Sequence, residues 1–329
     1  MAGKQPVLVT GGAGYVGAQV CKALARSGFL PVTYDNLVYG HKSAVRWGPL
    51  EIGDVTDSRR LTQVVRSYQP VAALHFAAFA YVGESVTEPE KYYHNNVYGS
   101  LNLLRVLRDE GVSRFVFSSS CATYGIPSSV PILESHPQRP VNPYGASKLM
   151  VERILADFEQ AYGLRSAILR YFNAAGADSD GEIGELHEPE THAVPLAILA
   201  ALGKIKNFEI YGTDYATPDG TAIRDYIHVE DLASGHILAL QRLLADGPSL
   251  AVNLGTGRGH SVKELLACVE RASDRTIPVK HGPRRAGDPP ELIANPTLAK
   301  EQLGWSARYG ELDPIVESAL RWHLAQDNR

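Results

Sequence analysis

Several features that mark large classes of protein are scarce or absent in this sequence. Its 329 residues contain no run of eighteen apolar residues, so we expect no membrane-spanning helix. The 32 lysine and arginine residues do not exceed the 36 aspartate and glutamate residues, and the net charge is −4. Because a nucleic-acid partner needs a basic surplus to hold its phosphates, we expect no nucleic acid among the partners. Since no apolar run is long enough to span a bilayer, we also expect no membrane partner.

Cysteine is also scarce. The three cysteines, Cys21, Cys121 and Cys268, are odd in number, lie far apart and match no metal-ligand spacing. Such usage is typical of a reducing compartment. The first residues run almost directly into a glycine-rich loop, which leaves no room for a signal peptide, and we therefore expect a cytoplasmic protein.

The first motif that is present combines a short strand, a glycine loop and a helix. Val7–Thr10 is an apolar run, Gly11, Gly14 and Gly17 follow it, and Ala18–Ser27 has helical periodicity. Glycines let the backbone approach a pyrophosphate, and the N-terminus of a helix supplies N–H donors to it. The motif therefore predicts a dinucleotide site, although a purely structural glycine turn has the same pattern.

An acidic residue at the end of the second strand extends this prediction. Leu30–Tyr34 ends at Asp35, eighteen residues after Gly17, where a carboxylate can accept hydrogen bonds from an adenosine ribose. It would repel the 2′-phosphate of NADP, so it favours NAD; a plain strand-ending aspartate is the alternative. Asp54 can reach the adenine, or it can cap a helix that starts near Ser58.

Strands and helices alternate over the first 175 residues. This order predicts an α/β fold with a doubly wound, Rossmann-like parallel sheet, whose ligands bind beyond the carboxyl ends of the strands. We expect residues 1–175 to form the cofactor domain and residues 176–329 a smaller, mixed substrate lobe, with the chain crossing between the two. We also expect a strand over Arg114–Ser118 and one long helix over Tyr92–Arg108. The candidate segments at strand ends are Gly11–Gly17, Asp35, Phe76–Ala78, Ser118–Ser120, Phe172 and Asn173.

The stretch Val141–Val151 contains the strongest candidate for catalysis. Tyr144 and Lys148 stand four residues apart, which places both side chains on one face of a helix. An ammonium beside a phenol favours the phenolate, so we expect the Tyr144 pKa to fall from about 10 toward neutrality. Ser120, just after the preceding strand, can share a substrate hydroxyl with that base. The same Tyr-x-x-x-Lys pattern also occurs on solvated helices.

The loop over residues 176–190 is acidic and rich in glycine. Carboxylates and imidazoles of the types that bind metals occur in it and just after it, but their spacing fits no ligand pattern that we can defend. We therefore expect no bound metal. The residues concerned are Glu185, His187, Glu188, Glu190 and His192.

A series of motifs along nearly the whole chain resembles the UDP-glucose 4-epimerase family of the extended short-chain dehydrogenase/reductase superfamily. The motifs include TGGAGYVG (Thr10–Gly17), SSSCATYG (Ser118–Gly125), NPYGASK (Asn142–Lys148), RYFNAAGA (Arg170–Ala177) and PRRAGD (Pro283–Asp288). The resemblance implies an NAD-dependent isomerase that interconverts UDP-glucose and UDP-galactose through a transient 4-keto sugar. It also implies a homodimer formed through the helices near Tyr92–Arg108 and Tyr144–Tyr162.

The resemblance also implies roles for individual residues. Tyr144 would be the base, Lys148 its activator and the anchor of the nicotinamide ribose, and Ser120 the hydroxyl partner. The NAD-binding residues would be Gly11, Gly14, Tyr15, Val16, Gly17, Asp35, Asn36, Leu37, Asp54, Val55, Phe76, Ala77, Ala78, Ala80, Asn95, Tyr144, Lys148 and Phe172. The UDP-sugar would be held by Ser120, Tyr144, Asn173, His192, Ala193, Phe208, Tyr211, Arg224, Tyr226, Arg285 and Asp288.

Two positions depart from the family pattern. Many members have a phosphate-binding lysine where this chain has Ala80, and we expect NAD binding to survive on backbone donors. At the position that resembles the family's size gate near the sugar, this chain has Leu292 in place of a large aromatic residue. We therefore expect some turnover of a UDP-N-acetylhexosamine.

Three alternative functions are weighed against the hexose epimerase. A UDP-arabinose/UDP-xylose 4-epimerase is the nearest, because parts of the motifs also resemble enzymes that act on UDP-pentoses. A 4,6-dehydratase needs carboxylates directly after the serine, and here Ser120 is followed by Cys121 and Ala122. A cofactor-sensing binding protein has no need of the Tyr144–Lys148 pair, which this chain keeps.

Overall fold

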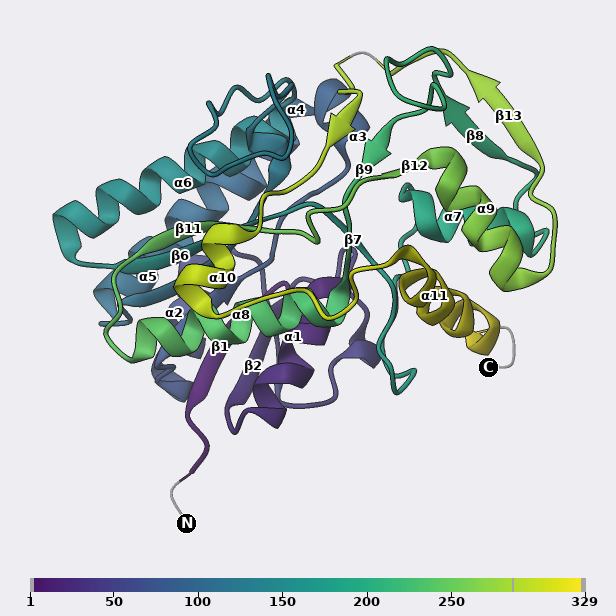
Figure 1. Ribbon diagram of the computed structural model, residues 1–329. Coiled ribbons are helices and arrows are strands. Elements are labelled where there is room, and N and C mark those ends of the chain that lie inside the picture. The colour runs from purple at the N-terminus through teal and green to yellow at the C-terminus, as the bar shows by residue number, and fades with distance from the viewer. Residues whose placement is uncertain (1–2, 286, 327–329) are drawn as a thin grey trace.

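Seven parallel strands form the central sheet of the protein, of which a computed structural model describes residues 3–285 and 287–326 (Figure 1). The strand order, β11-β6-β5-β4-β1-β2-β3, reverses between β1 and β4, which is the point where such sheets bind ligands. The predicted doubly wound parallel sheet is thus confirmed. The strands are β1 (Pro6–Thr10), β2 (Leu30–Asp35), β3 (Leu50–Ile52), β4 (Ala72–His75), β5 (Arg114–Ser120), β6 (Arg165–Tyr171) and β11 (Leu250–Leu254).

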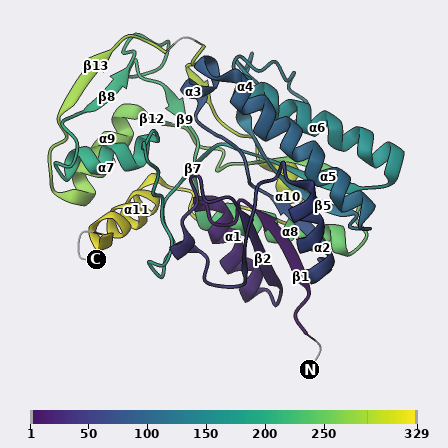
Figure 2. The same cartoon turned by 180° about the vertical axis from the view of Figure 1, so that it is seen from behind.

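Helices cover both faces of this sheet (Figures 1 and 2). Alternate residues of β1 show why two covers are needed: Val7 and Val9 face one apolar core, and Leu8 faces the other. α1 and α8 close the first core, and α2, α5 and α6 close the second. The bounds of these helices are α1 (Tyr15–Arg26), α2 (Ser58–Tyr68), α5 (Ser100–Asp109), α6 (Pro143–Tyr162) and α8 (Val229–Leu244).

A smaller lobe lies beside the sheet and has an apolar core of its own (Figure 1). Three helices surround this core, α7 (Ala193–Ala201), α9 (Val262–Ser273) and α11 (Leu312–Gln326), and the strand pair β8 (Phe208–Tyr211) and β13 (Val279–Gly282) borders it. The remaining short elements lie in the connections between these strands and helices. They are β7 (Asn173–Ala175), β9 (Ile223–Arg224), β10 (Tyr226–His228), β12 (His260–Ser261), β14 (Glu291–Leu292), α3 (Val82–Thr87), α4 (Pro89–Tyr92), α10 (Thr297–Leu303), and the 3-10 turns η1 (Lys42–Ala44) and η3 (Cys121–Thr123).

The expectation of a single long helix over Tyr92–Arg108 is wrong for the middle of that segment. α4 ends at Tyr92, a π-helical stretch follows over Tyr93–Gly99, and α5 begins at Ser100. The apolar periodicity of the sequence did not indicate this π-helical stretch. Gly99 lies at its end, where an added Cβ would come within 2.6 Å of a Val55 methyl group, so the stretch packs against its neighbours at glycine-only distance.

The chain returns to the first domain after residue 175. α8 and β11 come from residues 229–254, yet α8 packs against α1 and β11 pairs with β6 in the central sheet. The division that we expected at residue 175 stays a prediction. Ala286, within the predicted basic turn, and residues 327–329 at the end of the chain lie outside the described residues. Among the described helices, none has the length and apolar character needed to cross a membrane.

Candidate active site

The glycine loop after β1 is packed so tightly that side chains cannot replace its hydrogens. Gly11 has φ +75°, and a Cβ there would lie 2.5 Å from the backbone nitrogen of Ala77. A Cβ on Gly17 would lie 2.2 Å from the carbonyl oxygen of Gly11. The turn therefore brings the N-terminus of α1, which begins at Tyr15, directly to the edge of the sheet. Free N–H groups at such a helix start form an anion site.

The two predicted adenosine carboxylates are fixed by backbone donors. Asp35 accepts hydrogen bonds from the amides of Ala13, at 3.0 Å, and Leu37, at 2.8 Å. Asp54 accepts from the Thr56 amide at 2.8 Å, and also from the Asn36 side chain at 2.9 Å. The cap of α2 is Asp57, which leaves Asp54 free of the alternative role considered for it.

The small-residue crossing after β4 is held by a residue that the sequence did not single out. Asn96, in the π-helical stretch, accepts from the Phe79 amide at 2.9 Å and donates to the Phe79 carbonyl at 3.0 Å and to Ser147 at 3.1 Å. Its neighbour Asn95, the predicted NAD ligand, donates to Asn96 at 2.9 Å. Asn96 thereby ties the crossing, which includes the exposed Ala80, to the helix that carries the catalytic pair.

The predicted catalytic residues meet at the carboxyl end of β5. Ser120 ends that strand two residues later than expected, because Ser119 and Ser120 still pair with β6. Tyr144 and Lys148 lie one turn apart at the start of α6, and all three predicted side chains are buried. The Lys148 ammonium donates to the Ser118 carbonyl at 2.7 Å and lies 5.9 Å from the centre of the Tyr144 ring.

The pKa values of this pair differ from the sequence-based expectation. Burial raises the pKa of Tyr144, and the nearby Tyr171 adds to this, while a hydrogen bond with Ser120 opposes it. Burial lowers the pKa of Lys148 to about 7. The expected fall of the Tyr144 pKa is therefore wrong for this structure, because desolvation of the buried phenol is the largest influence on it.

A buried ion pair supports the same helix and was also missed. Glu152, one turn after Lys148, accepts from the Arg170 guanidinium at 2.7 Å and from the Ser119 hydroxyl at 2.6 Å. The pair joins α6 to β5 and β6 close to the predicted catalytic residues. The spacing of Glu152 from Lys148 was a usable signal in the sequence. Its partner Arg170 lies eighteen residues away along the chain and becomes a neighbour only in the folded sheet.

The predicted UDP-sugar residues fall into separate groups. Arg224 pairs with Asp288 at 2.5 Å, and the Arg285 guanidinium stacks 3.9 Å from the centre of the Tyr211 ring, so these two pairs stand between β8, β9 and β14. The others lie at the ends of elements: Asn173 at β7, Ala193 at α7, Phe208 at β8 and Tyr226 at β10; the predicted NAD residue Phe172 follows β6. His192 caps α7 but contacts Glu185 rather than this arginine group.

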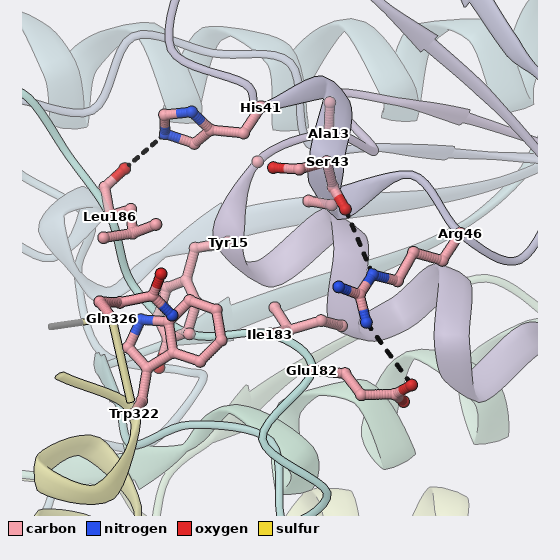
Figure 3. Close-up of a pocket in the computed structure, with 13 residues that line it drawn as sticks. Ala13, Tyr15, His41, Ser43, Arg46, Glu182, Ile183, Leu186, Trp322 and Gln326 are labelled. Atoms are coloured by element: carbon pink, nitrogen blue, oxygen red, sulfur yellow. Dashed lines mark hydrogen bonds and ion pairs between the residues drawn. The ribbon is translucent and has the colours of Figure 1, made fainter. Parts of the chain in front are cut away.

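A surface pocket opens beside the glycine loop (Figure 3). Ala13 and Tyr15 line it from the loop, and Trp322 lines it from α11. Arg46 spans it to Glu182 at 3.6 Å. Tyr144, Lys148 and Ser120 do not line this pocket.

Comparison with known proteins shows the family to which the chain belongs. A model of the NAD dependent epimerase/dehydratase family matches residues 7–255. The chain belongs to this family. A UDP-glucose 4-epimerase of Rhizobium leguminosarum bv. trifolii is 54% identical over 323 residues, 98% of either chain. Of the solved structures, UDP-glucose 4-epimerase from Brucella ovis in complex with NAD is 54% identical with a TM-score of 0.94, and covers 97% of this chain and 98% of its own.

A third relative carries both ligands. UDP-glucose-4-epimerase from Stenotrophomonas maltophila, solved with bound NAD and formylated UDP-arabinopyranose, is 39% identical with a TM-score of 0.95, and the match covers 98% of this chain and 99% of that one. The NAD dependence of the epimerase/dehydratase family fits the residues present here. The close packing at Gly11 and Gly17, which holds the start of α1 at the edge of the sheet, and the carboxylate of Asp35 at the end of β2 suit a dinucleotide without a 2′-phosphate.

Proposed function

We propose that the protein is an NAD-dependent 4-epimerase that interconverts UDP-glucose and UDP-galactose. One observation carries the proposal: Tyr144, Lys148 and Ser120 converge, buried, at the end of β5, beside the glycine loop. The relatives named UDP-glucose 4-epimerase support the hexose over the pentose and dehydratase alternatives.

The catalytic roles follow from the chemistry of these side chains. When bound, NAD takes up the hydride from sugar C4 and returns it, so that no external oxidant is consumed. Tyr144 removes the proton of the 4-hydroxyl, and Ser120 hydrogen-bonds the same oxygen. Lys148, whose pKa burial lowers to about 7, can take the proton of the Tyr144 hydroxyl, and the ammonium so formed stabilises the phenolate that accepts the proton of the 4-hydroxyl. The 4-keto sugar then turns and receives the hydride on its other face.

The UDP moiety is assigned to the arginine group of the smaller lobe. A guanidinium presents paired N–H donors that match the oxygens of a diphosphate. Arg285 is stacked on Tyr211 and Arg224 is held by Asp288, so both forks are oriented before the ligand arrives. Leu292 pairs with Arg224 in the β9–β14 ladder, which puts the predicted size gate next to this group.

Turnover of UDP-galactose without added NAD tests the function. We expect conversion to UDP-glucose, seen by NMR, and a fall in kcat of about 10²–10⁴-fold in Tyr144→Phe because the base is lost. Tyr162→Phe, at the exposed end of the same helix, should keep the activity of the wild type. A Tyr144→Phe variant that retains activity within tenfold would contradict the assignment.

The sugar preference is tested in the same assay. We expect UDP-glucose to outcompete UDP-xylose, because the relatives are named for the hexose. Turnover of UDP-N-acetylglucosamine above background would support the open gate at Leu292, and its complete absence would remove that hypothesis.

We also propose a cytoplasmic homodimer. Leu101 on α5 and Met150 on α6 are large apolar side chains that are 40% and 41% exposed, on the two helices that the family resemblance assigns to the interface. All three cysteines are free, as a reducing compartment allows. Sedimentation equilibrium should give twice the chain mass, and Leu101→Glu should shift it toward the monomer; a monomeric wild type would contradict the proposal.

A further inference from the structure

Four side chains of the loop between β7 and α7 come together although their spacing in the sequence matched no metal motif. They are the carboxylates of Glu185 and Glu190 and the imidazoles of His187 and His192. One ligand atom from each lies within 4.8 Å of every other. The group thus offers two nitrogen and two oxygen ligands close together, and it includes none of Tyr144, Lys148 and Ser120.

The distances within the group match those between ligands that share one ion. The Glu185 carboxylate lies 2.7 Å from His192 Nδ1 and 3.2 Å from His187 Nδ1. Glu190 lies 3.3 Å from His192 Nδ1 and 3.8 Å from His187 Nδ1. Ligands bonded at about 2.0–2.1 Å to a tetrahedral zinc ion lie about 3.3 Å apart. The four separations scatter around that value.

Both imidazole nitrogens that point into the group lack a hydrogen bond. His187 Nδ1 and His192 Nδ1 are closed to solvent, and in the described part of the chain neither has a hydrogen-bond partner despite the nearby carboxylates. Buried polar atoms are usually paired, because an unpaired one forfeits its interaction with water. Coordination of an ion by the lone pair of each nitrogen would satisfy both.

A second acidic group in the same loop already contains a cation from the protein. Asp178, Asp180 and Glu182 also converge, but the Lys22 ammonium occupies their centre at 2.6–2.7 Å from all three. Within residues 3–285 and 287–326, the ion pairs of Glu185 and Glu190 are with the two histidines and with no lysine or arginine. Among the described residues, the first group therefore has no lysine or arginine at its centre, and its ion-pair partners are imidazoles, which are cationic only when protonated.

We propose that Glu185, His187, Glu190 and His192 bind one zinc-like divalent transition-metal ion. Two imidazoles and two carboxylates suit such an ion in tetrahedral coordination, and four protein ligands make the site structural. The proposal replaces the expectation, from sequence spacing, that no metal binds.

The site would clamp the loop that leads into α7. The loop is already attached at both sides: the Tyr15 hydroxyl donates to the Gly176 carbonyl at 2.5 Å, and His41 Nε2 bonds the Leu186 carbonyl at 2.9 Å (Figure 3). His187 also stacks edge-on against Tyr81, next to the small-residue crossing. An ion here would join the loop to the start of α7, where His192 stands.

Metal binding can be measured without the sugar reaction. Full-length protein stripped with a chelator is titrated with zinc chloride by calorimetry, and with cobalt(II), whose absorption reports tetrahedral coordination. We expect one equivalent of zinc and a tetrahedral cobalt spectrum. His187→Gln and Glu190→Gln should each weaken zinc binding at least tenfold. His41→Gln is the matched control, because it removes an imidazole that holds the same loop without being a ligand.

Three results would overturn the proposal: no uptake of a full equivalent by the wild type, equal affinity in His187→Gln, or an octahedral, water-rich cobalt spectrum. Should a variant fail to fold, anomalous diffraction at the zinc edge from wild-type crystals gives the answer by position, with a peak expected between the four side chains and its absence counting against the site. Epimerase activity enters none of these measurements, so failure of the proposed function and failure of this site are distinguishable.

Discussion

Glu152 and Arg170 form a charge pair that is almost closed to water, and their value depends on both partners being present. Their side chains are 5% and 8% exposed. A buried ion pair is costly to desolvate, but removal of one partner leaves the other charge uncompensated. The pair is therefore best understood as a unit that fixes α6 against β5 and β6, directly behind Lys148.

Neutralising Glu152 tests this interpretation. Glu152→Gln should lower the free energy of unfolding by about 3–5 kcal/mol, because Arg170 stays buried without a counter-charge. Urea unfolding followed by circular dichroism measures the change. The double variant Glu152→Leu/Arg170→Met should recover most of the loss, since it removes both charges. Equal destabilisation of the single and double variants would show that packing, not charge, is what matters there.

The limits of sequence reasoning are clearest at this scale. Gly11, Gly17 and Asp35 could be predicted because turn geometry and strand ends are local properties of the chain. The pKa of Tyr144 could not, because it is set by burial, which depends on elements far away in the sequence. Asn96 and Glu152 escaped notice for the same reason: their partners Phe79 and Arg170 become neighbours only on folding.

At the scale of elements, β4 carries a buried histidine whose charge state couples the sheet to pH. His75 bonds Thr10 of β1 at 2.6 Å and Ser100 of α5 at 2.8 Å. Burial lowers its pKa from 6.5 to about 3, and the nearby Lys148 adds to the shift. The folded protein therefore keeps this imidazole neutral where the unfolded chain would protonate it.

The stability of the fold should accordingly fall on acidification. Between pH 6.5 and 3 the unfolded state binds the proton and the folded state does not, so the free energy of unfolding drops by up to about 1.4 kcal/mol per pH unit from this residue. His75→Gln should remove that part of the slope between pH 7 and 5. His236, whose pKa is also lowered, contributes equally to both proteins. Identical slopes would contradict the prediction.

The elements themselves were predictable where hydrophobic periodicity is regular. The strands β1, β2 and β5 agree with their expected positions to within two residues. The π-helical stretch at Tyr93–Gly99 could not be predicted, because one widened turn leaves the apolar stripe nearly unchanged. The helices after residue 260 had no strong motif and were left unassigned.

At the scale of the whole molecule, Lys22 links the two parts of the chain. Its ammonium is buried on α1 and bonds three carboxylates of the loop that follows β7. Asp178, the most buried of them, has a fully enclosed side chain. The contact therefore joins the first βα unit to the segment that enters the smaller lobe.

Lys22→Met should lower the free energy of unfolding by about 3–5 kcal/mol, because Asp178 then remains buried without a cation. Thermal melts of the purified variant measure the effect. Arg26→Met is the control: Arg26 pairs with Asp180 at the surface, and loss of an exposed pair costs about 1 kcal/mol or less. A similar, small effect of both substitutions would show that Lys22 is not the link described.

The return of residues 229–254 to the first sheet has a practical consequence for engineering. A gene fragment that stops at residue 175 would lack the edge strand β11 and the covering helix α8, and would leave β6 unprotected on one side. Chimeras that exchange sugar recognition between relatives therefore need two grafts, one before and one after this returning segment, rather than a single crossover point.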